Sequence, residues 1–193
     1  MKKTVLTTTL NLCFVSLICL FSGMTKDEGK FQIYCFDKGV LADKGFKLSP
    51  SEYDSTWHSF MKKMNLSEAS LVLDDTKIKN YFWENQELTI SENGYKELKE
   101  FEKNNRHLSH CKFIVVLHNK RIYCGEFLSF MSAMSVKHPV IHFDLGAMSK
   151  KTNTLRIFPE HSIEEYSFFS ENIRKTTATE EIKNYFTSVS KLK

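Results

Sequence analysis

The chain has 193 residues, of which 41% are hydrophobic and 26% are charged, with only 3 prolines and 7 glycines. This length and composition predict one globular domain with a hydrophobic core, and they exclude disordered, collagen-like and disulfide-dense classes of protein. The net charge is +4, part of which comes from Lys2 and Lys3 at the N-terminus. So balanced a charge does not favour nucleic-acid binding. The sequence carries no catalytic signature, so it indicates location and fold more directly than function.

The first 23 residues have the parts of a secretory signal. Lys2 and Lys3 give a positive start, residues 5–21 are mostly apolar, and Ser22 or Gly23 offers a small residue for cleavage. Threonine, asparagine and serine interrupt the apolar stretch, which makes it weaker than a good membrane span. The N-terminal pattern therefore predicts export.

We expect residues 1–23 to be a signal peptide and residues 24–193 to be a single domain in the periplasm or cell envelope of a bacterium. Two alternatives stay open. Residues 5–21 could remain as an uncleaved N-terminal anchor to the inner membrane, or Cys19 could be the site of lipidation. Any contact with a membrane would run through this segment alone.

The pattern after the N-terminal segment predicts a strand, a loop and a helix. Residues 31–36 alternate apolar and aromatic side chains, as a strand does, and the glycine-punctuated residues 39–45 are typical of a loop. Ser49 and Glu52 then form a capping box, with Pro50 at the first helical position. Large apolar side chains recur at helical spacing after this cap. They are Tyr53, Trp57, Phe60, Met61 and Met64.

The middle of the chain predicts more strands and a second helix. Residues 71–73 form a short strand that ends at the acidic turn 74–75. Residues 81–90 form a strand pair or a bent strand around Asn85 and Gln86. Ser91 caps a helix that runs to about residue 105. Its inward side chains are Tyr95, Leu98 and Phe101.

The last part of the domain predicts a hairpin, an apolar loop, two strands and a helix. The hairpin covers residues 112–125 and turns at Asn119-Lys120, which places Val115 opposite Cys124. The apolar loop covers residues 127–134, and the two strands cover residues 139–145 and 154–158. Residues 177–180 form the capping box of the final helix. The side chains of that helix expected to face inward are Ile182, Tyr185, Phe186 and Val189. The whole pattern predicts an α+β fold, in which two or three helices pack on a mostly antiparallel sheet.

Three cysteines remain after the N-terminal segment, namely Cys35, Cys111 and Cys124. An odd number in an exported protein allows one disulfide and a free thiol, or no disulfide. In the predicted hairpin, Cys111 lies about 13 Å from the residue opposite Cys124, which is too far for a disulfide. Cys35 could reach either of the others from a neighbouring strand. The simplest interpretation is three small buried side chains.

Four features follow one another between residues 31 and 143. They are the strand starting FQIY at Phe31, the acidic turn DDTKI that ends at Ile78, the run LTISENG at residues 88–94, and the hairpin from VVL to Tyr123. This order resembles the head subdomain of the first periplasmic region of SecD, a subunit of the bacterial protein-export machinery. The resemblance implies an α+β head of that kind and no catalytic residues. It implies no translocation motor, because the chain has no membrane helices after residue 23. The chain is also similar to small exported bacterial proteins of unknown function that use this head alone.

Histidines near the end of the second predicted helix are the densest set of potential metal ligands. His107, His110 and Cys111 lie close in sequence, with His118 further on, and zinc needs three or four such ligands that converge. A polar helix C-terminus, where histidine is favourable, accounts for the same residues. We therefore expect no bound metal or other cofactor.

A cysteine–histidine nucleophile could be built from Cys124 with His138 or His142. The residues around Cys124 lack the positive cluster or helix N-terminus that lowers a thiol pKa. His138 and His142 on one strand stand about 13 Å apart and cannot share a metal ion. We expect no catalytic residue.

The candidate binding surface combines the hairpin tip with the large apolar side chains that follow the hairpin. These residues are Asn119, Lys120, Phe127, Leu128, Phe130 and Met131. The alternative is that the apolar members close the core over the sheet. If the surface is exposed, the expected function is a non-enzymatic binding module for another envelope protein or an exported polypeptide. The alternatives are a metal- or thiol-dependent envelope hydrolase and a periplasmic immunity or inhibitor protein.

Overall fold

The structure is a computed structural model that describes residues 30–46, 54–105, 108–129, 131–133, 135–136, 138–143, 153–158 and 179–193. The expected signal segment and the expected start of the first long helix lie outside these residues. The strands are β1 (Phe31–Phe36), β2 (Leu71–Asp74), β3 (Ile78–Phe82), β4 (Glu87–Ile90), β5 (Lys112–Leu117), β6 (Lys120–Leu128), β7 (Val140–His142) and β8 (Thr154–Phe158). The helices are α2 (Lys38–Asp43), α3 (Asp54–Lys63), the 3₁₀ turn η1 (Leu66–Glu68), α4 (Glu92–Asn104) and α7 (Glu180–Ser188).

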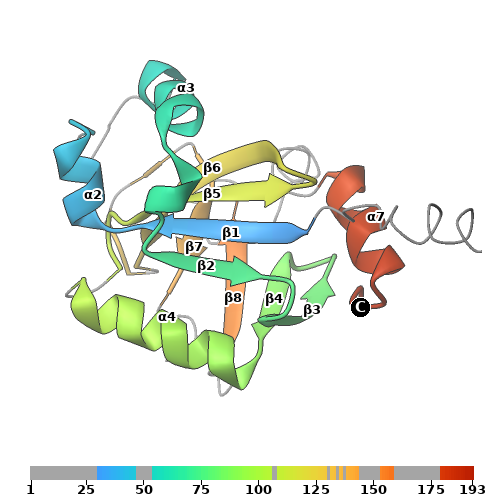
Figure 1. Cartoon of the computed structure of the whole chain (residues 1–193). Helices are drawn as coiled ribbons and strands as arrows, with labels where there is room; N and C mark the ends of the chain where they lie inside the picture. Colours follow the sequence, from blue (N-terminus) through green and yellow to red (C-terminus); the bar gives the residue numbers. More distant parts are fainter. Residues whose placement is uncertain are drawn as a thin grey trace, which may run out of the picture.

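The described strands form one eight-stranded sheet in the order β2-β1-β5-β6-β7-β8-β4-β3. Neighbouring strands are antiparallel except for the parallel pair β6 and β7. Strands β2 and β3 are the two edges, yet only residues 75–77 connect them. This connection spans at most about 14 Å, so the edges must approach each other and the sheet curls until it is nearly closed (Figure 1). The prediction of helices on a mostly antiparallel sheet is confirmed, and the mixed content fits the α+β class.

Side chains from the connection between β2 and β3 tie the two edges to the neighbouring helices. The Lys77 ammonium donates to the carbonyl of Val72 on β2 at 2.7 Å and to Glu97 on α4 at 2.6 Å. The Asp75 carboxylate accepts a hydrogen bond of 3.0 Å from the Tyr185 hydroxyl on α7. These side-chain contacts hold the short connection against β2, α4 and α7, while β2 and β3 themselves are not paired as neighbouring strands.

The open edge of β3 is covered by residues 191–193. The Tyr81 amide donates to the Lys191 carbonyl at 2.8 Å, and the Lys193 amide donates to the Tyr81 carbonyl at 2.9 Å. A short parallel bridge pairs Tyr81 with Leu192. Covering an edge in this way removes the unpaired backbone groups that would otherwise template pairing with another chain.

The main core fills the inside of the curled sheet. Alternate residues along each strand point inward, as the two-residue period of a strand requires. On β1 and β5 these are Phe31, Ile33, Cys35, Phe113, Val115 and Leu117. Helix α7 contributes Tyr185 and Phe186, and α4 contributes Leu98 and Phe101. Figure 1 shows α4 and α7 at the open sides of the sheet.

A second core lies on the outer face of the sheet beneath α3. Trp57, Phe60 and Met64 pack there against Ile114 and Val116 of β5. Strand β5 is therefore buried on both faces. The apolar face predicted for this helix is confirmed for these three side chains, while Tyr53 lies outside the described residues.

Several predicted elements are confirmed at their predicted residues. Strands β1 and β8 match, and the bent-strand region is a hairpin of β3 and β4. The Ser91 side chain caps α4 by accepting from the Gly94 amide at 3.2 Å. On that helix Leu98 and Phe101 reach the core as expected, whereas Tyr95 is only half-buried.

Two helix predictions need correction. The predicted loop at residues 39–45 contains helix α2, because the Asp37 carboxylate caps it by accepting from the Val40 amide at 2.9 Å. The final helix begins after Thr179 rather than after Thr177, because the Thr179 hydroxyl accepts from the Ile182 amide at 3.3 Å. Its inward residues Ile182, Tyr185 and Phe186 are buried, and Val189 is partly buried against them.

The β5–β6 hairpin differs from its predicted register. The turn residues are His118 and Asn119, with φ values of 50° and 61°, the left-handed pair that a tight two-residue hairpin turn requires. The turn thus comes one residue earlier than predicted, and a bulge at Ile122 then moves the pairing back by one residue. As a result Ile114 lies opposite Cys124, where the predicted register placed Val115. Strand β6 also continues to Leu128, so the predicted loop at 127–134 begins only after that residue.

Gly125 on β6 permits a close approach of the segment that leads into β7. A Cβ atom at this position would lie 2.0 Å from the Pro139 carbonyl oxygen and 2.6 Å from the Phe113 ring. Real side chains cannot approach backbone atoms so closely, so the parallel pairing of β6 and β7 depends on this glycine.

Gly125→Ala should lower the free energy of unfolding by about 2 kcal/mol or more, because overpacking next to backbone must separate β6 from β7. Urea unfolding followed by circular dichroism measures the loss. The control is Gly39→Ala in α2, where the nearest atom is a flexible carboxylate oxygen at 3.1 Å. That change should stay within about 1 kcal/mol. Equal stability of the two variants would show that the close approach at Gly125 does not matter.

Candidate functional site

The structure divides the candidate surface into exposed and buried residues. Asn119 and Lys120 are exposed at the hairpin tip, and Met131 is 72% exposed. Phe127 and Leu128 are only 0% and 2% exposed. These two residues belong to the core, which is the alternative that the sequence left open for the apolar members, while Phe130 lies outside the described residues. Their burial follows from the continuation of β6, since Phe127 points inside the sheet and Leu128 packs against Val140 and Val136.

The exposed members of the candidate surface also lie apart. Strand β6 separates Lys120 from Leu128, and its eight residue steps cover roughly 26 Å at about 3.3 Å per residue. Met131 follows three residues later, and three residues reach back no more than about 10 Å. The hairpin tip and Met131 therefore do not form one continuous patch.

Helix α7 supports the hairpin tip. The Lys120 ammonium lies 3.6 Å from the Glu181 carboxylate, and the His118 ring meets the Tyr185 ring edge-on with centroids 5.8 Å apart. The turn itself is fixed by the left-handed conformation of His118 and Asn119. The tip is thus an exposed projection that is held in place from its base.

A cluster of polar side chains is buried on the outer face of the sheet beneath α3. Its members come from four segments: Lys112 on β5, Glu126 on β6, His138 just before β7, and Trp57 on α3. We call this set the Lys112–Glu126 cluster. Buried charged residues are rare unless they are paired, so the cluster is the most unusual chemical feature of the described residues.

The geometry of the Lys112–Glu126 cluster centres on the Glu126 carboxylate. Its Oε1 lies 2.8 Å from Nε2 of His138, and its Oε2 lies 4.0 Å from Nζ of Lys112. The Lys112 ammonium sits 3.9 Å from the centroid of the Trp57 ring, which also stacks at a tilt on His138 with a centroid distance of 4.3 Å. Trp57 therefore covers both groups that flank the carboxylate.

Burial changes the electrostatics of Lys112. Removal from water lowers the pKa of its ammonium, and the opposing charge of Glu126 restores only part of it. Neither Nζ of Lys112 nor Oε2 of Glu126 has a hydrogen-bond partner, although both are inaccessible to solvent. The two atoms face each other without forming the short contact that usually stabilises a buried ion pair.

Sequence reasoning did not detect this cluster. Lys112 is the only charged residue of β5, and Glu126 is the only charged residue in the buried part of β6, from Tyr123 to Leu128. A single charge in such a stretch is the signal that could have indicated the cluster. The predicted hairpin register placed Lys112 opposite Phe127, whereas the bulge at Ile122 places it opposite Glu126.

The candidate metal ligands considered from the sequence do not come together in the described residues. Cys111 points into the core inside the sheet, and His107 lies outside the described residues. His110 is partly exposed, with Nδ1 3.9 Å from Oε2 of Glu126. Within the described ranges, no three histidine, cysteine or carboxylate side chains could hold a metal ion.

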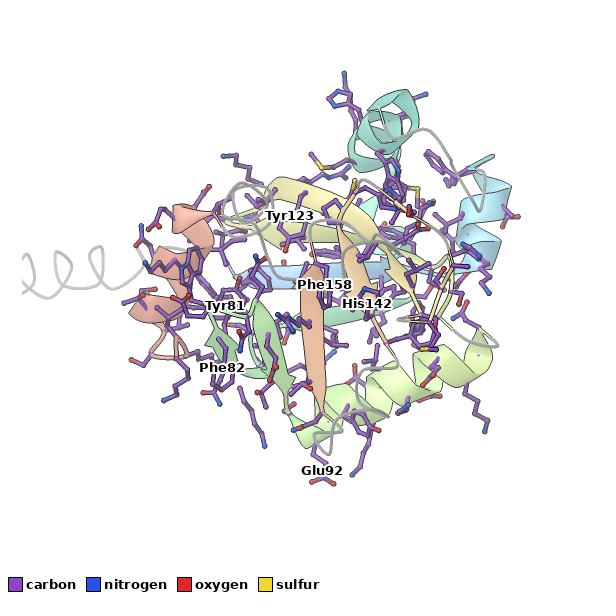
Figure 2. The ribbon with its side chains drawn as sticks, turned by 180° about the vertical axis from the view of Figure 1, so that it is seen from behind. Tyr81, Phe82, Glu92, Tyr123, His142 and Phe158 are labelled. Atoms are coloured by element: carbon purple, nitrogen blue, oxygen red, sulfur yellow. The ribbon has the colours of Figure 1, made fainter. Side chains whose placement is uncertain are left out.

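The two remaining candidate histidines occupy different surroundings. His138 belongs to the Lys112–Glu126 cluster, whereas His142 lies on β7 with its ring edge-on to Phe158 at 4.6 Å (Figure 2). Figure 2 shows His142 and Phe158 side by side on the face of β7 and β8.

The three cysteines are free and buried. Cys35 and Cys111 lie inside the sheet, whereas Cys124 lies on the outer face, where its thiol donates to the Trp57 carbonyl at 3.7 Å. Burial raises the pKa of Cys124 to about 12 and that of Cys111 to about 11, although nearby Lys112 and Lys38 act in the opposite direction. At neutral pH these groups are thiols, which are poor nucleophiles.

No protein-family model matches the chain, and no match is found among curated proteins or solved structures. Among the helices of the described ranges, none is long and apolar enough to cross a membrane.

The burial of Cys124 predicts very slow alkylation of the folded protein. At pH 8 its reaction with iodoacetamide should be at least about 100-fold slower than that of the same cysteine in urea, because both access and thiolate content are reduced. Peptide mass spectrometry after timed labelling measures the rate for each cysteine separately. Rapid labelling of Cys124 in the folded state would instead support a thiol nucleophile.

Proposed function

We propose that the protein is a non-enzymatic binding module of the bacterial cell envelope. Its partner would be another envelope protein or an exported polypeptide, bound at the hairpin tip formed by His118, Asn119 and Lys120. The observation that carries this proposal is the contrast between the tip and the reactive groups. The tip is exposed and supported by α7, whereas the cysteine and lysine that could act as nucleophiles are buried.

The exposed groups of the tip favour a partner surface that is polar or acidic. These groups are a lysine ammonium, which lies 3.6 Å from the Glu181 carboxylate, an amide and an imidazole. Because the backbone of the turn is already fixed, binding would cost little conformational entropy at this position. Met131 is left out of the proposed contact, since β6 holds it at the other end of the hairpin.

A thiol-dependent hydrolase is the competing hypothesis, and it would need Cys124 as its nucleophile. The buried thiol, with a pKa of about 12, disfavours that role.

The resemblance to the SecD periplasmic head supports the proposed class of partner. The resembling segment, residues 31–143, contains seven of the strands, while β8 lies outside it and joins β7 to β4. In this chain the segment is thus completed by a later strand. A head of this type would suit contact with exported polypeptides, which is the partner class proposed here.

We further propose export with cleavage near Gly23. The expected outcome is a mature protein that begins at residue 23 or 24 in the envelope fraction, because the small residues after the apolar stretch permit cleavage. Intact mass spectrometry of protein with a C-terminal tag identifies the first residue. An uncleaved chain in the membrane fraction would favour the anchor, and a tagged protein confined to the cytoplasm would contradict export.

The proposed contact can be tested by photo-crosslinking in cells, with a photoreactive amino acid at position 119. We expect one dominant adduct. Lys120→Glu should reduce its yield at least about fivefold, because one interfacial charge contributes roughly 1 kcal/mol or more.

The matched control is Lys96→Glu, since Lys96 is 71% exposed and paired with Glu92 on α4, as Lys120 is 69% exposed and paired with Glu181. The control should leave the adduct unchanged. No adduct from position 119, or an equal loss in both variants, would contradict binding at the tip.

A further inference from the structure

Lys112 and Glu126 lack the short hydrogen bonds that normally stabilise a buried ion pair. They lie directly opposite each other on β5 and β6, and their side chains are only 2% and 1% exposed. Nζ and Oε2 are 4.0 Å apart, and neither atom has a hydrogen-bond partner. A buried ion pair is stable when short hydrogen bonds compensate both charges, and here that compensation is missing.

We propose that Lys112 and Glu126 are joined by an intramolecular isopeptide bond between Nζ of the lysine and Cδ of the glutamate. The covalent bond would leave a neutral amide in place of two buried charges. It would also cross-link adjacent strands beneath α3. This proposal does not depend on the binding function proposed above.

The surroundings of Lys112 favour the uncharged amine that the reaction needs. An amine attacks a carboxyl carbon only in its neutral form, and the desolvation of Lys112 favours that form. The Trp57 ring, whose centroid lies 3.9 Å from Nζ, shields the amine from water on one side. Transfer of one proton from the ammonium to Oε2 of Glu126 makes both partners uncharged.

His138 is placed to assist at the carboxyl group. Its Nε2 lies 2.8 Å from Oε1 of Glu126, which is the oxygen that stays in the amide. As a donor, the imidazole would stabilise the negative charge that develops on Oε1 in the tetrahedral intermediate. The fold itself holds amine, carboxyl and imidazole together, so no bimolecular encounter is required.

The reaction balances without any other reactant. The nitrogen lone pair of Lys112 forms the N–Cδ bond, and the Cδ–Oε2 bond breaks. Oε2 leaves as water, with its own carboxyl proton and one proton from the nitrogen. Nothing is oxidised or reduced, and the chain loses one water molecule.

Intact mass spectrometry under denaturing conditions tests the proposal on the purified protein. We expect a mass lower than the sequence mass by one water molecule, and tryptic peptides joined through Lys112 and Glu126 with no cleavage after Lys112. The ion pair between Lys77 and Glu97, at 2.6 Å and partly exposed, is the internal control and should yield separate peptides. If the protein without substitutions instead has the full sequence mass, and its peptides with Lys112 and Glu126 are separate, the proposal is overturned.

Variants separate the reaction from other sources of water loss. Lys112→Arg and Glu126→Ala should each restore the full sequence mass, which is measurable even if the variant folds poorly. Persistent water loss in either variant would refute the assignment. In His138→Ala, a smaller fraction of freshly synthesised chain should have lost water at each time after a pulse label than in the unsubstituted protein, and equal fractions at all times would refute the role given to His138.

Discussion

The three residues between β2 and β3 connect the two edges of a single sheet, and they are too few to let those edges separate. This constraint makes the sheet curl, because a flat arrangement of eight strands would hold β2 and β3 far apart. Two of these three residues also hold the connection against its neighbours. Asp75 accepts a hydrogen bond from α7, and Lys77 donates to both β2 and α4. The interior produced by this curling is filled by the inward side chains of the strands, and α4 and α7 cover its open sides. Local hairpins and helix caps could form without this connection, but the core could not.

The same curling gives the sheet an outer face, and α3 encloses part of it. Strand β5 is consequently buried on both sides, so a charged residue on that strand has no route to water. Lys112 occupies such a position, and the bulge at Ile122 brings Glu126 opposite it. Trp57 and His138 pack against the two groups, and neither Nζ of Lys112 nor Oε2 of Glu126 is accessible to solvent. The chemistry of this cluster is therefore determined by the packing of a helix and by one irregularity in a hairpin.

The enclosure of reactive groups and the exposure of the hairpin tip are two results of one arrangement. Cys124 and Lys112 are close to α3 and lose access to solvent, while the tip of the same hairpin extends past the sheet and rests on α7. Strand β6 thus begins at an exposed polar turn and continues into the core. Its length separates Lys120 from Met131 and assigns the turn, rather than the whole region after the hairpin, to the proposed contact.

The sequence alone determined the elements whose signals are local. Ser91 predicts the start of α4, the apolar alternation of residues 31–36 and 154–158 predicts two strands, and Trp57, Phe60 and Met64 mark the buried face of α3, because capping and periodicity depend only on near neighbours. The tertiary structure decided the sheet order, the bulge at Ile122, the burial of Phe127 and the meeting of Lys112 with Glu126. A bulge of one residue changes which side chains face each other along the rest of a hairpin, and whether a face is covered depends on segments far away in the chain. Those outcomes arise from packing between distant residues, which no local pattern encodes.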